Sequence, residues 1–91
     1  MEIRKIFVVG SGLMGSGIAQ TALQYGYEVI LNDQSKAALE RGQAGISQRL
    51  DRLVEKGKLT AEEKQDCMDR LHITPSVHTA SNVDLVIEAI Y

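Results

Sequence analysis

Two kinds of apolar pattern alternate along this chain, and they predict strands and helices in turn. Residues 3–9 form a short apolar run, rich in β-branched side chains, that is typical of a buried parallel strand. From residue 13, apolar side chains recur every three or four positions up to Tyr25, which predicts a helix that Gly26 ends. Residues 28–33 predict a second strand. A strand, a helix and a strand within about 30 residues indicate one right-handed βαβ unit.

The second half of the chain begins with the pattern of two helices. Ser35 is a favourable N-cap, and the single apolar stripe that follows it predicts a long helix over residues 36–56. Thr60 and Glu63 have the spacing of a capping box, which predicts a second helix that reaches about Leu71. Because the link between the two helices is short, we expect them to form an antiparallel pair.

Two further strands complete the pattern. Residues 72–74 predict a short third strand stopped by Pro75, and residues 84–90 predict a fourth. These elements predict an α/β fold: the first mononucleotide-binding half of a Rossmann-type parallel sheet, with strand order 3-2-1-4 and a long helical hairpin between the second and third strands. A complete doubly wound domain has more strands and helices, so we expect residues 1–91 to be the N-terminal part of a larger domain.

Residues 10–15 match the pattern G-x-G-x-x-G between the first strand and the first helix. Gly10 lets the strand turn sharply, Gly12 lets the backbone approach a pyrophosphate, and Gly15 lets the helix pack closely on the strand. Gly17 is expected to add close packing, and the helix start offers unpaired N–H groups to phosphates. The motif alone also fits an ordinary tight turn, but its place between a strand and a helix favours a pyrophosphate site. The residues assigned to this site are Gly10, Ser11, Gly12, Leu13, Met14 and Gly15.

Asp33 closes the second strand about 20 residues beyond the loop, where a dinucleotide-binding domain has its ribose acceptor. Its carboxylate is able to accept hydrogen bonds from both adenosine ribose hydroxyls, and it would repel the 2′-phosphate of NADP. No arginine lies beside it in the sequence; Gln34 adds a neutral amide and Lys36 is the only nearby cation. We therefore predict NAD as the cofactor, bound in part by Asp33 and Gln34. A role for Asp33 at the helix entry is the alternative, but Ser35 already fills that role.

Composition and charge exclude several classes of function. The chain has 44% hydrophobic and 24% charged residues, as soluble globular proteins do, and its net charge of -2 gives no basis for binding nucleic acid or an anionic membrane. No apolar run approaches the ~20 residues of a membrane span, and the first residues run into a strand rather than a secretory signal. The single cysteine, Cys67, fits a reducing compartment, so we expect a cytoplasmic protein. One cysteine and two scattered histidines supply no metal site.

The connection between the second and third strands is long for a nucleotide-binding half, and it carries a basic side. Arg49, Arg52, Lys56 and Lys58 contribute the positive charges. This side is either solvated helix surface, balanced by neighbouring glutamates, or a site for an anionic substrate such as the phosphate-bearing part of a carrier.

Four stretches of the chain resemble, in order, the N-terminal NAD-binding domain of 3-hydroxyacyl-CoA dehydrogenases, and of the bacterial 3-hydroxybutyryl-CoA dehydrogenases in particular. They are the glycine loop with the helix start at 10–20, the Asn-Asp pair at 32–33, the Lys-Gly-Lys-Leu-Thr-Ala-Glu-Glu segment at 56–63 and the strand at 84–90. The glycine loop is shared by many dehydrogenases, but the long helical insertion narrows the choice.

The resemblance implies roles for matching residues. The loop would hold the pyrophosphate and Asp33 the adenosine ribose, while Ala89 and Ile90 would line the cofactor groove at the end of the fourth strand. Lys56 would contact coenzyme A on the hairpin, with Lys58 as the alternative. The family passes hydride from a 3-hydroxyacyl-CoA to NAD and removes the hydroxyl proton with a histidine–glutamate pair. That pair lies beyond residue 91 in the family, so we assign no catalytic residue and expect the 91 residues alone to be inactive.

Other functions stay open at this stage. A related NAD-dependent 3-hydroxyacid or sugar-acid dehydrogenase would share the same motifs, as would a non-catalytic module that binds NAD or ADP. An acyl-CoA is the expected partner of the parent enzyme. We also expect the fourth strand to leave an open apolar edge, through which copies of the chain associate.

Overall fold

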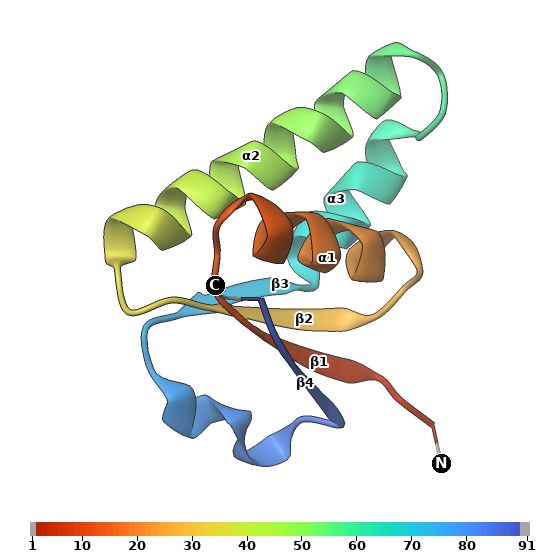
Figure 1. Ribbon diagram of the computed structural model, residues 1–91. Coiled ribbons are helices and arrows are strands. Elements are labelled where there is room, and N and C mark those ends of the chain that lie inside the picture. The colour runs from red at the N-terminus through yellow and green to blue at the C-terminus, as the bar shows by residue number, and fades with distance from the viewer. Residues whose placement is uncertain (1, 90–91) are drawn as a thin grey trace.

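The chain folds into a parallel β-sheet with helices packed on one of its faces (Figure 1). The computed structural model describes residues 2–89, in which the sheet has the order β3-β2-β1-β4 and every pairing is parallel. This order and the hairpin between β2 and β3 confirm the fold predicted from the sequence. The elements are β1 (Lys5–Val9), α1 (Leu13–Gln24), β2 (Glu28–Asn32), α2 (Lys36–Glu55), α3 (Ala61–Asp69), β3 (Leu71–Thr74), η1 (Val77–Asn82) and β4 (Leu85–Glu88).

The main core lies between the sheet and the three helices α1, α2 and α3. Figure 1 shows these helices above the sheet and the short 3-10 helix η1 below it. Alternate residues of β1 and β2 face the helices, because side chains along a strand point to opposite faces in turn. Ile6 pairs with Val29 and Val8 with Leu31, and all four are buried in this core.

The predicted helix boundaries follow from their capping residues. The Ser35 hydroxyl accepts the Ala38 amide at 3.1 Å, so α2 begins where the sequence places it. Thr60 and Glu63 form both hydrogen bonds of a capping box, at 2.9 and 3.0 Å. The second helix ends at Asp69, slightly before the predicted end, because the next residues enter the sheet as β3. The antiparallel hairpin of α2 and α3 projects beyond the sheet in Figure 1.

The helix α2 crosses directly over the glycine loop, and Gly42 makes this approach possible. A Cβ atom at Gly42 would lie 2.8 Å from the carbonyl oxygen of Ser11 and 3.4 Å from its Cβ. Real Cβ atoms essentially never lie that close to a backbone oxygen, so a side chain at position 42 would force the backbone to shift. The contact fixes the distance between α2 and the loop that joins β1 to α1.

The outer side of α1 is an open apolar groove. A hollow of about 520 Å³ lies along this side of α1; its lining is mostly apolar side chains and includes Gly17. A Cβ atom at Gly17 would have nothing within 4 Å, so the prediction of close packing at Gly17 is wrong. Leu13 and Tyr25, at the two ends of the helix, are 84% and 80% exposed.

No helix in residues 2–89 combines the length and the apolar character that crossing a bilayer requires.

Gly42→Ala is expected to lower the free energy of unfolding by about 1–3 kcal/mol, because the added methyl group overlaps the Ser11 carbonyl. Glycine-to-alanine changes inside helices usually stabilise by ~1 kcal/mol, so the expected sign is reversed. Gly45→Ala is the matched control in the same helix. Its methyl group would meet a side-chain nitrogen of Arg49 at 3.1 Å rather than a backbone atom, and we expect no loss of stability. Urea unfolding measures both variants, and equal stabilities would contradict the contact.

Candidate cofactor-binding site

The glycine loop begins where β1 ends, at the carboxyl edge of the sheet. Gly10 has φ of 102°, a left-handed conformation that favours glycine, and its N–H donates to the carbonyl of Asn32 at 2.7 Å. Gly12 is the N-cap of α1 and makes no side-chain capping hydrogen bond. The first helical hydrogen bond runs from the Ser16 N–H to the Gly12 carbonyl at 2.8 Å. The N–H groups of Leu13, Met14 and Gly15, which precede this bond, have no partner within the helix.

The glycines at 12 and 15 have opposite surroundings. A Cβ atom at Gly12 would have nothing within 4 Å, whereas one at Gly15 would overlap the carbonyl oxygen of Gly10. Gly15 therefore packs α1 against the loop, and Gly12 borders open space. Leu13 and Met14 are the first two residues of α1, and both side chains are exposed. The close packing expected at Gly15 is present, and the role of Gly12 beside a pyrophosphate stays a prediction.

Asp33 lies just after β2 and is held by three hydrogen bonds. Its Oδ2 accepts the amide of Ser11 at 3.0 Å and the hydroxyl of Ser11 at 2.9 Å, and its Oδ1 accepts the amide of Ser35 at 3.0 Å. These donors lower the pKa of Asp33 below its ordinary value, the Ser35 amide most and the Ser11 amide next. The carboxylate is therefore charged at neutral pH and already oriented.

Two hollows flank the loop. One, of about 320 Å³, lies at the carboxyl ends of β1 and β2; it is lined by Val9, Gly10, Asn32, Asp33, Gln34 and Val77. The other, of about 230 Å³, lies between α1 and α2; it is lined by Ser11, Gly12, Leu13, Ser16, Ala38, Arg41, Gly42, Gly45 and Arg49. The structure thus brings the predicted loop residues, Asp33 and Gln34 together around one edge of the sheet.

An arginine that the sequence did not indicate lies near Asp33. Arg41, on α2, lowers the pKa of Asp33 through its positive charge, although by less than the amide donors do. The prediction that Lys36 is the only nearby cation is therefore wrong. Arg41 lies eight positions after Asp33 in the sequence, and the first two turns of α2 bring it back toward the loop. This helix also carries Arg49, which donates to the side-chain oxygens of Gln20 and Ser16.

Of the remaining predicted site residues, Ala89 lies beside the loop, Lys56 lies far from it, and one is outside the described part. Ala89 is buried beside the loop: its N–H donates to the Val9 carbonyl at 2.7 Å, and its Cβ would lie 3.5 Å from a Cβ at Gly15. Ile90 lies outside the described residues. Lys56 caps the far end of α2, exposed at the tip of the hairpin and about 30 Å along the helix from Ser35.

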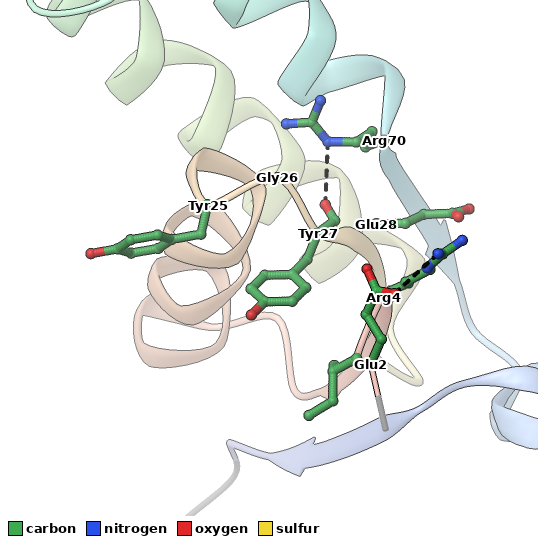
Figure 2. Close-up of a pocket in the computed structure, with 8 residues that line it drawn as sticks. Glu2, Arg4, Tyr25, Gly26, Tyr27, Glu28 and Arg70 are labelled. Atoms are coloured by element: carbon green, nitrogen blue, oxygen red, sulfur yellow. Dashed lines mark hydrogen bonds and ion pairs between the residues drawn. The ribbon is translucent and has the colours of Figure 1, made fainter.

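A further hollow, of about 840 Å³, lies at the opposite, amino-terminal ends of β1 and β2 (Figure 2). Its charged side chains already have partners. Arg70 donates to the carbonyls of Tyr27 and Leu23 at 3.3 and 2.6 Å, and Arg4 pairs with Glu2 at 3.1 Å. Because the N-terminus of α1 and the Asp33 carboxylate both lie at the carboxyl ends of the strands, we do not assign the cofactor to this hollow.

Sequence reasoning missed Val77 and Arg41 as neighbours of the site. Val77 belongs to η1, which has no apolar periodicity in the sequence, so nothing marked it. A helical projection of α2 offered a signal for Arg41. The small residues Ala38, Gly42 and Gly45 recur every three or four positions, which marks the face that approaches α1 closely.

A parallel sheet of this order, with a glycine loop after β1 and a carboxylate after β2, defines a dinucleotide-binding domain of the Rossmann type. The chain belongs to a particular family of such domains, described as "3-hydroxyacyl-CoA dehydrogenase, NAD binding domain", whose family model matches residues 5–91. NAD is the cofactor of this family. The family predicted from the sequence is thereby confirmed.

Relatives with established names agree with this assignment. A probable 3-hydroxybutyryl-CoA dehydrogenase of Bacillus subtilis is 43% identical over 90 residues, which cover 99% of this chain and 31% of the relative. One of Deinococcus radiodurans is 43% identical over 86 residues, with 94% and 31% covered. The crystal structure of 3-hydroxybutyryl-CoA dehydrogenase from Escherichia coli is 42% identical, with a TM-score of 0.96, and the match covers 100% of this chain and 19% of that one. The chain thus spans about a third or less of the length of these relatives.

The contribution of Asp33 to stability is expected to disappear in acid. Because its pKa is lower in the folded chain, this contribution is complete above the unfolded pKa of about 3.9 and is lost as the pH falls through the folded value. We expect Asp33→Asn to be less stable than the original chain at pH 7, and the difference to shrink below about pH 4. Urea unfolding at pH 7, 4 and 2.5 measures it, with Glu40→Gln as an exposed control on α2. A difference that is the same at every pH would contradict this role.

Proposed function

We propose that this chain binds the ADP half of NAD and forms the N-terminal part of the cofactor domain of an NAD-dependent 3-hydroxyacyl-CoA dehydrogenase. The observation that carries the proposal is the pairing of an open helix N-terminus at Gly12 with an oriented carboxylate at Asp33. The pyrophosphate would lie over Gly12 and accept the N–H groups of Leu13 and Met14. The ribose would lie at Asp33 and Gln34.

The proposed reaction of the whole enzyme is hydride transfer from a 3-hydroxyacyl-CoA, such as 3-hydroxybutyryl-CoA, to NAD. The names of the relatives support this substrate class over a free 3-hydroxyacid or a sugar acid. Bound NAD supplies the hydride acceptor; the 91 residues bind and orient it, and we assign none of them to proton removal. We propose Lys56 as a contact for coenzyme A, supported by its charge and its exposed place on the hairpin.

Charge and cysteine content support two further parts of the proposal. The net charge of -2 favours a protein that binds neither nucleic acid nor an anionic membrane. Cys67 is buried, and its burial raises the pKa of the thiol, so it is poorly reactive. A single buried thiol fits the reducing environment of the cytoplasm, where we place the protein.

Substitutions at two glycines of the loop test cofactor binding against folding. Gly12→Ala adds a methyl group in open space, so we expect stability to fall by less than about 1 kcal/mol. The same methyl group blocks a pyrophosphate at this position, so affinity for NAD and ADP should fall at least about tenfold. Gly15→Ala overlaps the Gly10 carbonyl and should cost about 3 kcal/mol of stability or more.

Isothermal titration calorimetry and urea unfolding separate these effects. The original chain should bind NAD and ADP, and NADP more weakly, because the Asp33 carboxylate repels the 2′-phosphate. If the Gly12→Ala variant binds NAD with unchanged affinity, the pyrophosphate lies elsewhere.

We also propose that the chain associates with itself through the edge of β4. This strand lies at one end of the sheet, and Leu85 and Val86 on it are 39% and 49% exposed. Sedimentation velocity should detect a dimer that grows with concentration, and Val86→Lys should weaken it by placing a charge on the edge. His72→Lys, on the opposite edge strand β3, is the control and should leave the dimer intact. A strict monomer at high concentration would rule out the association.

A further inference from the structure

We propose that Ser11 is a positioning residue of the ribose site, whose hydroxyl and amide hold the Asp33 carboxylate in the orientation that receives the adenosine ribose. The inference rests on the proposed function, because it assigns the ribose to Asp33. It gives Ser11 a role distinct from that of the loop residues that face the pyrophosphate.

Both hydrogen-bond donors of Ser11, its amide and its hydroxyl, donate to one oxygen of the Asp33 carboxylate. The amide lies 3.0 Å and the hydroxyl 2.9 Å from Oδ2 of Asp33. Ser11 is only 3% exposed, so its hydroxyl is buried against Asp33. A buried hydroxyl at this place therefore acts on a ligand through Asp33 rather than by touching it.

The other carboxylate oxygen is held from a different element. Oδ1 of Asp33 accepts the Ser35 amide at 3.0 Å, at the start of α2. A carboxylate has about four acceptor positions, and three of them are used inside the chain. Donors on both oxygens prevent the carboxylate from rotating, and the remaining acceptor position keeps a fixed direction. Without the Ser11 hydroxyl, Oδ2 would keep only the Ser11 amide as a donor, so the carboxylate would be held less firmly before a ribose binds.

Ser11 is itself fixed by α2. A Cβ atom at Gly42 would lie 2.8 Å from the Ser11 carbonyl oxygen, so the backbone of α2 packs closely against Ser11. One side of Ser11 contacts α2, and its donors point to the end of β2. Its position is therefore set by the fold before any ligand binds, which is the requirement for preorganisation.

A second buried serine near the loop provides a matched control. Ser16 is also 3% exposed, and its hydroxyl donates to the Leu13 carbonyl at 3.3 Å and accepts from Arg49 at 3.3 Å. It has no hydrogen bond to Asp33 among those of residues 2–89. Ser11→Ala and Ser16→Ala thus remove the same buried group from the same neighbourhood, and only the first removes a donor from the carboxylate.

The experiment compares ADP with 2′-deoxy-ADP, because a positioning role acts on the recognition of the ribose hydroxyl. Calorimetry on the full 91-residue chain gives the ratio of the two dissociation constants for the original chain and both variants. We expect ADP to bind more tightly to the original chain, and Ser11→Ala to reduce the ratio by roughly three- to tenfold. Ser16→Ala should leave the ratio unchanged, even if both affinities fall together.

A measurement on the original chain covers the case in which Ser11→Ala does not fold. The Ser11 amide proton, followed by NMR, should keep its hydrogen-bonded chemical shift when ADP is added; a move to a solvent-exposed shift would overturn the inference. If the original chain binds ADP but Ser11→Ala keeps the full ratio, the positioning role alone is overturned. If the original chain binds neither ADP nor NAD, the proposed function is overturned and the inference with it.

Discussion

The close contact between Gly15 and the carbonyl of Gly10 is the constraint on which the candidate site depends. Any side chain at Gly15 would overlap that oxygen, so the first turn of α1 rests directly on the end of β1. This contact points the free N–H groups of α1 toward the carboxyl edge of the sheet. The open space beside Gly12 is the other half of the arrangement, since a helix start that faced packed protein would receive no anion.

Electrostatics at this edge follow from the same packing. The Asp33 carboxylate keeps its negative charge, which is stabilised by the amides of Ser11 and Ser35 and by the charge of Arg41. The negative charge therefore stays on the ribose side of the loop, and the N–H groups of α1 remain available on the other side. The two halves of an adenosine diphosphate group, one anionic and one rich in hydroxyls, match this division.

The surfaces of the domain are unequal. Helices α1, α2 and α3 cover one face of the sheet, while the described part of the other face is accompanied by η1 (Figure 1). Apolar side chains lie exposed along α1 and on β4, at Leu13, Tyr25 and Val86. Single exposed apolar side chains are common on protein surfaces, whereas the groove along α1 brings several of them together. The chain spans about a third of the length of the two 3-hydroxybutyryl-CoA dehydrogenases that it matches.

Local patterns in the sequence predicted the order of elements, the helix starts and the glycine loop, because each depends on neighbours a few positions apart. The apolar period, the Ser35 cap and the Thr60–Glu63 capping box are all of this local kind. The surroundings of Asp33 were decided only by the tertiary structure. Arg41 reaches it because α2 folds back over the loop, and Ser11 reaches it because β1 and β2 are paired side by side. Such contacts join residues that are distant in the sequence, and their formation depends on how closely the backbones pack, which a local pattern does not encode.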